Sequence, residues 1–207
     1  MKHQPYELAK IHPDALSASF QHRKELSDKF RDVLGLMYLD YISIEIINPD
    51  EEFIFLSAFP AVNFNLISNH FWPYDGAISP SFYKHQTFIQ WEEAYHPVFY
   101  HELKKTKESE FGFCCGFSLV RKINQFYLLY SFATKNSDKE IKNFFHEKIN
   151  DVLKIGDYCY KLIRPIYLNY SPVYRPPIIT QFYPFVSGVP KESVNFSSHL
   201  KLVVNNV

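Results

Sequence analysis

Apolar side chains alternate between two spacings along the chain, and the spacing predicts the order of helices and strands. Over residues 14–37 they recur every three or four positions, as in a helix that buries one face, with Asp14 as its cap and Gly35 as its stop. Residues 41–47 then alternate with period two, which predicts a strand whose even positions are isoleucines. A second strand is predicted over residues 53–59.

The middle of the chain is less regular. We predict a short helix over residues 60–71, a long irregular stretch that begins at Trp72, a short strand over residues 87–91 and a helix over residues 98–109. Irregular stretches of this length inside a compact domain are often functional. The last of these helices carries three lysines that we expect to face solvent: Lys104, Lys105 and Lys107.

A hairpin and a long helix follow. The hairpin covers residues 117–133, and its second strand has apolar residues on both faces, so we expect helices to cover it on both sides. The helix begins at Ser137 or Asp138 and runs to about Arg164, where Pro165 is expected to end it. The apolar residues of this segment recur at helical spacing, so we expect them to form one buried face of the helix.

This order of elements predicts an α+β fold in which a central antiparallel sheet is covered by helices on both faces, an α/β/α sandwich. We divide the chain into a domain of residues 1–166 and an extension of residues 167–207 that is rich in proline and aromatic residues. Residues 198–204 have strand character and are suited to adding to a sheet edge.

Composition narrows the function. The chain has 207 residues, 46% of them hydrophobic, and equal numbers of basic and acidic residues at 22 each. Without a basic excess, direct binding of nucleic acid is not expected. No apolar run is long enough for a membrane span or a classical leader. The three cysteines form no even disulfide framework, which favours reduced thiols and a cytoplasmic location; export by a non-classical signal stays open.

The middle of the chain resembles the autoinducer-binding domain of LuxR-type quorum-sensing regulators, over about residues 38–164. In that family a proline begins a pocket helix, an Asp-Pro pair follows, a tryptophan comes some fifteen residues later, and two glycines precede a hairpin. The corresponding residues here are Pro60, Asp75 with Gly76 in place of proline, Trp91, Gly112 and Gly116.

The resemblance implies a sensor with layers like those of PAS and GAF domains and a ligand pocket between the sheet and residues 60–91. By the resemblance, Asp75 would accept a hydrogen bond from a ligand amide and Trp91 would form an aromatic wall. Typical relatives bind an acyl-homoserine lactone, but the family's pocket tryptophan and tyrosine fall here near Asn63 and Ile67. No helix-turn-helix pattern follows residue 167. The predicted ligand-binding residues are Asp75, Trp91, Asn63, Ile67, Trp72 and Tyr74.

Simpler interpretations stand beside these. Asp75 before Gly76 is also typical of a surface turn, Trp91 of a core side chain, and the two glycines of positive dihedral angles or close packing. The chain is therefore either a free-standing sensor of a small organic signal, which leaves regulation of a partner and a homodimer open, or an interaction protein that uses residues 167–207.

An enzyme is the third hypothesis. It ranks last because the sequence contains no catalytic signature and no cofactor or metal motif. Its most concrete form is a thiol hydrolase, with nucleophile and base drawn from Cys114 or Cys115 and from His96, His101 or His146.

Overall fold

A computed structural model describes residues 5–185 of the chain. Its centre is a six-stranded sheet with the strand order β1-β3-β2-β6-β5-β4. Neighbouring strands from β3 to β4 are antiparallel, whereas β1 pairs in parallel with β3, so the sheet is mixed and not purely antiparallel as predicted. The strands are β1 (Lys10–Ile11), β2 (Tyr41–Ile47), β3 (Glu52–Ser57), β4 (Phe88–Gln90), β5 (Cys115–Ile123) and β6 (Phe126–Thr134).

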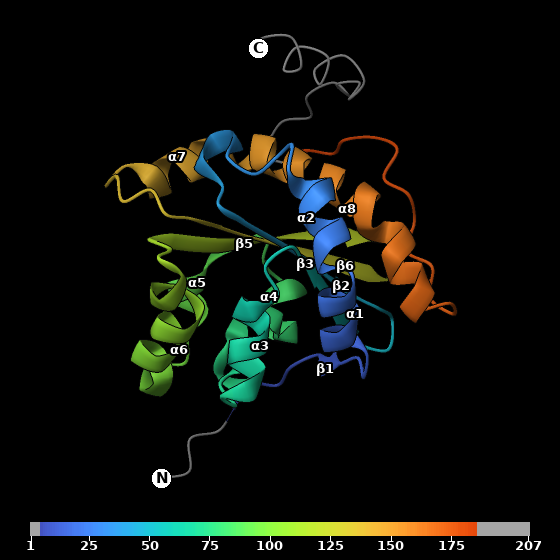
Figure 1. The fold of residues 1–207 in the computed structure, drawn as a ribbon, viewed down its shortest axis with the longest axis horizontal. Helices are drawn as coiled ribbons and strands as arrows, with labels where there is room; N and C mark the ends of the chain where they lie inside the picture. The colour runs from blue at the N-terminus through green and yellow to red at the C-terminus, as the bar shows by residue number, and fades with distance from the viewer. Residues whose placement is uncertain (1–4, 186–207) are drawn as a thin grey trace.

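Helices cover both faces of the sheet, which confirms the predicted α+β fold (Figure 1). On one face lie α2 (Arg23–Phe30), α7 (Ile141–Glu147) and α8 (Ile149–Tyr170). On the other face lie α3 (Ala61–Ser68), α4 (Pro80–Tyr83), α5 (Trp91–Ala94) and α6 (Tyr100–Lys107), with α1 (Ala15–Gln21) packed against β3. Short 3₁₀ turns, among them Trp72–Tyr74 and Gly76–Ile78, connect the small helices.

The two faces of the sheet differ in chemistry because side chains alternate along each strand. Ile42, Ile44 and Ile46 of β2 join the large apolar core beneath α2 and α8. Tyr41 and Glu45 point the other way, toward α3 and α6. All seven residues of β2 are buried, as expected for a strand covered on both sides.

Two predicted helices have different bounds. The first is broken at His22 into α1 and α2, and Gly35 then takes a left-handed conformation with φ of +89°. The second is broken at Lys148, and it continues through Pro165 to Tyr170, so the prediction that this proline ends the helix is wrong. Proline removes one backbone donor, but Ile166 and the residue after it are buried, and that burial favours continuing the helix.

The segment of residues 171–185 packs along α8. Tyr160 donates its hydroxyl to the carbonyl of Pro177 at 2.7 Å, and the side chains of Ile179 and Phe182 are buried. The strand predicted over residues 198–204 lies outside the described residues, and the division of the chain at residue 166 stays a prediction. Within residues 5–185 no helix is both long and apolar enough to cross a membrane.

Candidate functional site

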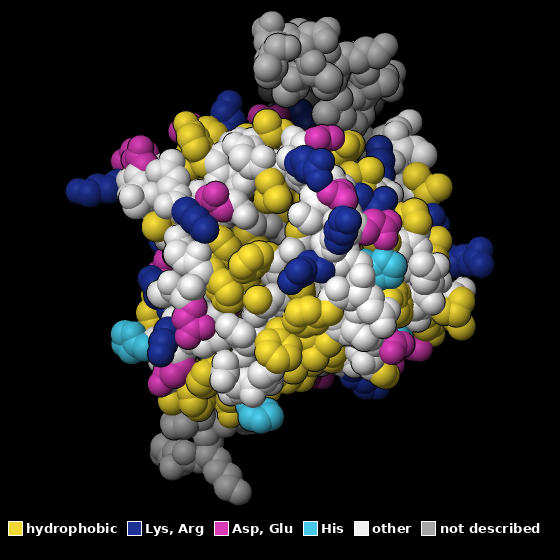
Figure 2. Space-filling model, viewed as in Figure 1, with side chains coloured by type: hydrophobic (Ala, Val, Ile, Leu, Met, Phe, Trp, Pro, Cys, Tyr) yellow, Lys and Arg dark blue, Asp and Glu magenta, His cyan; other side chains and the backbone are white. Residues whose placement is uncertain are grey.

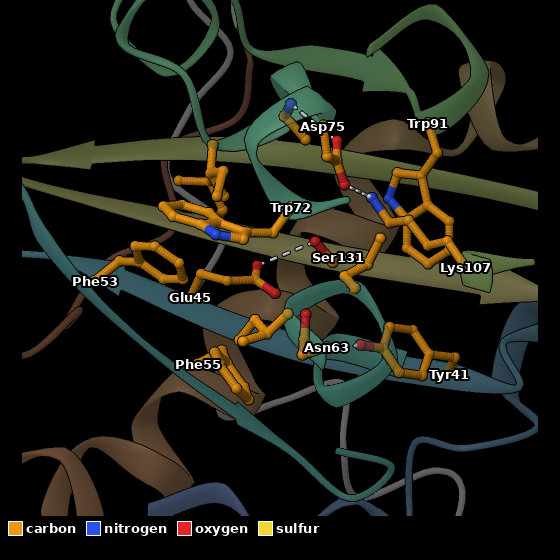
Figure 3. A pocket seen from close by; sticks show the side chains of 15 residues that line it. Tyr41, Glu45, Phe53, Phe55, Asn63, Trp72, Asp75, Trp91, Lys107 and Ser131 are labelled. Atoms are coloured by element: carbon orange, nitrogen blue, oxygen red, sulfur yellow. Dashed lines mark hydrogen bonds and ion pairs between the residues drawn. The ribbon is translucent and has the colours of Figure 1, made fainter. Parts of the chain in front are cut away.

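A small cavity lies between the sheet and the layer that contains α3 and α6 (Figure 3). Its volume is about 40 Å³, which is room for a few water molecules. The residues that line it come from β2, β3 and β6 of the sheet, from α3, from residues 72–78, and from Trp91 and α6. They are Tyr41, Glu45, Phe53, Phe55, Asn63, Leu66, Ile67, Trp72, Asp75, Ala77, Ile78, Trp91, Lys107, Leu129 and Ser131.

One wall of the cavity is an ion pair beside an indole ring. Asp75 accepts the backbone N–H of Ala77 on Oδ1 at 3.1 Å, which caps the 3₁₀ turn Gly76–Ile78. Its Oδ2 accepts a hydrogen bond from Lys107 Nζ at 2.6 Å. The same ammonium lies 4.2 Å from the centre of the Trp91 ring, a cation–π contact. Both charged side chains are under 10% exposed, so the pair is buried.

A row of small hydroxyl side chains crosses the sheet next to the cavity, and one of them, Ser131, lines it. Ser57, Ser43, Ser131 and Ser118 are paired neighbours on β3, β2, β6 and β5. Trp91 Nε1 donates to Ser118 Oγ at 3.1 Å, and the two hydroxyls of Ser118 and Ser131 are 2.9 Å apart. This chain of hydrogen bonds fixes the indole against the sheet.

Glycine makes the close approach of Trp91 possible. A Cβ atom on Gly116 would lie 2.0 Å from the indole ring, which no real contact allows. Gly112 has a different role, since it ends the turn Ser109–Phe111 with a left-handed φ of +73°. The two glycines of the motif therefore serve the two structural roles expected of them.

Glu45 continues the hydrogen-bonded row into the middle of the cavity. Ser131 donates its hydroxyl to Glu45 Oε2 at 3.0 Å. Figure 3 shows the carboxyl group beside the rings of Phe53, Phe55 and Trp72. Burial raises the pKa of Glu45 to about 7, because a charged carboxylate loses its hydration there, while hydrogen bonds and the Lys107 charge favour its ionised form less strongly.

The described lining carries more negative than positive groups. Two carboxyl groups, Glu45 and Asp75, face one ammonium group, that of Lys107. Because Lys107 is engaged with Asp75, Glu45 has a hydroxyl partner but no cation of its own. A carboxylate can accept about four hydrogen bonds, so Glu45 keeps acceptor capacity that the protein does not use.

Five of the six predicted ligand-binding residues line the cavity: Asp75, Trp91, Asn63, Ile67 and Trp72. Tyr74 does not, because its ring packs against Phe99 with centroids 4.2 Å apart. Asp75 keeps the hydrogen bond of a turn residue but is buried, so a surface location is wrong for it. Binding of a ligand by these residues stays a prediction.

Sequence reasoning missed Glu45 and Lys107. Lys107 was expected on the solvent face of its helix, but it is buried because it follows buried Leu103 by four residues and shares its side of α6. A charged residue within the largely apolar run Tyr41–Ile47 was the available signal for Glu45. Both positions break the local pattern, as functional residues often do.

The thiol-hydrolase hypothesis finds no activated nucleophile. Cys115 is buried, and burial raises the pKa of its thiol to about 11, which disfavours the reactive thiolate. Burial also raises the pKa of the Cys159 thiol. Cys114 is exposed and directs its Sγ to the carbonyl of Lys135. Among residues 5–185, no group of three or more His, Cys, Asp or Glu side chains is arranged to hold a metal.

No model of a known protein family matches the sequence, and no curated protein matches it. Solved structures with a partly similar backbone include two of SdiA. SdiA in complex with octanoyl-rac-glycerol is 14% identical, with a TM-score of 0.44, over 69% of this chain and 59% of that one. A crystal structure of Escherichia coli SdiA is 10% identical, with a TM-score of 0.48, over 75% of this chain and 69% of that one.

The chain thus spans less than two thirds of the first of these structures. Both similarities are low in identity and in TM-score, so they do not identify a ligand for this chain.

Proposed function

We propose that this chain is a sensor-like binding domain that holds a small organic molecule between its sheet and the layer of α3 and α6, and that binding regulates a partner protein. The observation that carries the proposal is the buried cavity lined by Glu45, Asp75 and Lys107. Ionisable side chains in a cavity beside aromatic rings are typical of recognition sites.

Energetics support this proposal. Burying an ionisable group without full compensation costs several kcal/mol, and a core made of apolar side chains avoids this cost. Glu45 lies on a strand whose seven residues are all buried, and the isoleucines on the opposite face of that strand form ordinary core. If a ligand donates the missing hydrogen bonds to Glu45, the burial of this carboxyl group at the cavity has a physical reason.

The cavity also has a rim that can yield to a larger molecule. Four of its lining residues are only half-buried: Asn63, Ile67, Trp72 and Ile78. Pockets for organic ligands usually have volumes of about 300–1,000 Å³, so binding requires α3 and residues 72–78 to move apart. These two segments are short and lie at the molecular surface beside exposed Phe64, which makes them the natural entry.

Native mass spectrometry of protein isolated from its own cells tests the proposal. We expect an added organic mass on the wild type, and loss of that mass in Ile67→Trp, whose indole would fill the rim. Ser68→Trp is the matched control, because residue 68 is on the same helix but exposed. If the wild type carries no added mass and cell extracts leave its thermal stability unchanged, the sensor proposal is wrong.

The second candidate is an interaction protein without a ligand, and one observation favours it. The short segment of residues 171–185 carries three highly exposed, large apolar side chains. Val173 is 80% exposed, Ile178 63% and Tyr183 64%. Hydrophobic side chains also gather on the face that carries α3 and α1, where Phe20 and Phe64 pack edge to face (Figure 2). Such surfaces often mark protein contacts.

A triple serine variant at Val173, Ile178 and Tyr183 tests this candidate. If these side chains bind a partner, a protein that the wild type recovers reproducibly in a pull-down should be lost from the variant. Serine at the exposed Thr180 and Gln181 of the same segment is the control. Equal recovery by both variants would remove the segment as a binding surface.

A further inference from the structure

We propose that the ligand carries a protonated amino group, which donates to the carboxylate of Glu45 and lies against the rings of Trp72 and Phe53. This inference rests on the proposed function, because it names the chemical class that the same cavity binds. It concerns Glu45, which the resemblance to autoinducer-binding domains did not assign.

Charge inside the cavity is the first reason. The lining contains Glu45 and Asp75 against the single ammonium of Lys107, which leaves one carboxyl group without a cation. Asp75 is already satisfied, with Ala77 N–H on one oxygen and Lys107 on the other. Glu45 accepts a hydrogen bond from the Ser131 hydroxyl, forms no ion pair among the described residues, and is 5% exposed. A cation entering the cavity therefore has Glu45 as its free acceptor.

Aromatic side chains around this carboxyl group are the second reason. Phe53 and Trp72 line the cavity with ring centroids 6.2 Å apart, and Phe55 lies on the same side. Rings attract a cation through their negative faces, most strongly for tryptophan. The protein already uses this geometry nearby, where the Lys107 ammonium lies over Trp91. A carboxylate with flanking rings is therefore matched to an ammonium group.

The rest of the ligand is apolar. From Glu45 the cavity leads to the half-buried rim formed by Ile67, Trp72 and Ile78. A short alkyl or aryl chain attached to the ammonium group would pass between these side chains. The ligand class is thus a small primary amine with an apolar body, and a neutral alcohol of the same length should bind less well.

Binding should depend on pH. In the described part of the chain, three other titratable groups line the cavity with Glu45. They are the Lys107 ammonium on α6, the Asp75 carboxylate at the start of the turn Gly76–Ile78, and the Tyr41 hydroxyl on β2. Because the pKa of Glu45 is raised to about 7, its carboxylate is mostly protonated at about pH 5 and mostly ionised at about pH 8. An alkylamine stays protonated throughout this range. Affinity for the amine should therefore rise from about pH 5 to about pH 8.

The probes for the test are n-hexylamine and n-hexanol, with binding followed by thermal stability and calorimetry at about pH 8. We expect wild type to bind the amine more tightly than the alcohol. In Glu45→Gln the dissociation constant for the amine should rise by about tenfold or more, which corresponds to about 1.4 kcal/mol, while the alcohol is unaffected. Glu147→Gln, at an exposed position of α7, is the control for loss of one negative charge and should bind like wild type.

Each result separates the two proposals. If Glu45→Gln and wild type bind the amine equally, or if the alcohol binds as tightly as the amine, the amine proposal is overturned while a small-molecule sensor survives. An affinity for the amine that falls from about pH 5 to about pH 8 also overturns it. If wild-type protein from its own cells carries no organic mass and hexylamine does not bind, both proposals fail.

Discussion

The two faces of the sheet each bury an ion pair, and they bury it in different ways. Under α8, Asp157 pairs with the Arg121 guanidinium and also accepts from Tyr130 at 2.9 Å. The remaining guanidinium nitrogen, Nη1, donates to the carbonyl of Tyr183. On the opposite face Lys107 pairs with Asp75, and Glu45 forms no ion pair with any residue of the described part of the chain.

The difference separates a structural site from the site at which we propose that a ligand binds. Around Arg121 the charges balance, and the hydrogen bonds tie β5 and α8 to the segment of residues 171–185. Arg121 also lines an open hollow at the surface with Ile179 and Tyr183, but both carboxylate oxygens of Asp157 are already hydrogen-bonded. Around Glu45 the charges do not balance, and a cavity lies beside them. A balanced buried pair stabilises an arrangement, whereas an unbalanced group beside a cavity favours recognition.

The largest loss of stability is expected on the face of the sheet that carries the Arg121–Asp157 ion pair. Arg121→Met leaves Asp157 buried without its cation, and removing one partner of a buried pair costs about 3–5 kcal/mol of unfolding free energy. Urea unfolding measures the loss. In the double variant Arg121→Met with Asp157→Asn, much of the stability should return. A single variant within about 0.5 kcal/mol of wild type would show that the pair does not hold the two elements together.

A matched pair of glycines compares packing on the two faces. A Cβ atom would lie 2.0 Å from the Trp91 ring at Gly116 and 2.0 Å from the Tyr130 ring at Gly156. Alanine at either position should cost about 1–3 kcal/mol. Only Gly116→Ala should also change the tryptophan fluorescence of the folded protein, because it displaces Trp91. Unchanged fluorescence in that variant would contradict the contact.

The smallest effect is expected at Ser43, at the centre of the serine row. Its Oγ has no hydrogen-bond partner among the described residues and is buried. Ser43→Ala removes an unsatisfied group and should leave stability unchanged or raise it by up to about 1 kcal/mol. Ser131→Ala is the comparison variant, and it should lower the stability because it removes the hydroxyl that donates to Glu45. A clear loss in Ser43→Ala would mean that this hydroxyl has a partner.

Periodicity predicted the sheet well, because strands covered on both sides have a strong apolar signal. The strand over residues 41–47 has the bounds of β2, and the hairpin is present as β5 and β6. Helix ends were predicted less well, since Pro165 remains within α8 for the sake of buried residues that follow it. Local propensity does not include that tertiary packing.

The candidate site was predicted in part. Asp75 and Trp91 were identified by resemblance, and the structure places both at one cavity. Lys107 was missed because a lysine on an amphipathic helix usually faces solvent, and its partner Asp75 is 32 residues away in sequence. Glu45 and Ser131 are 86 residues apart, so no short-range pattern could show that they meet.

The most direct test of the unbalanced carboxyl group is the stability of wild type and Glu45→Gln between about pH 5 and about pH 8. With a pKa raised from 4.5 to about 7 in the folded state, Glu45 holds a proton that the unfolded chain releases, so wild-type stability falls as pH rises through this range. The expected loss from this group over this range is about 2.5 kcal/mol. The curve of Glu45→Gln should be flatter by that amount, and parallel curves for the two proteins would contradict an uncompensated Glu45.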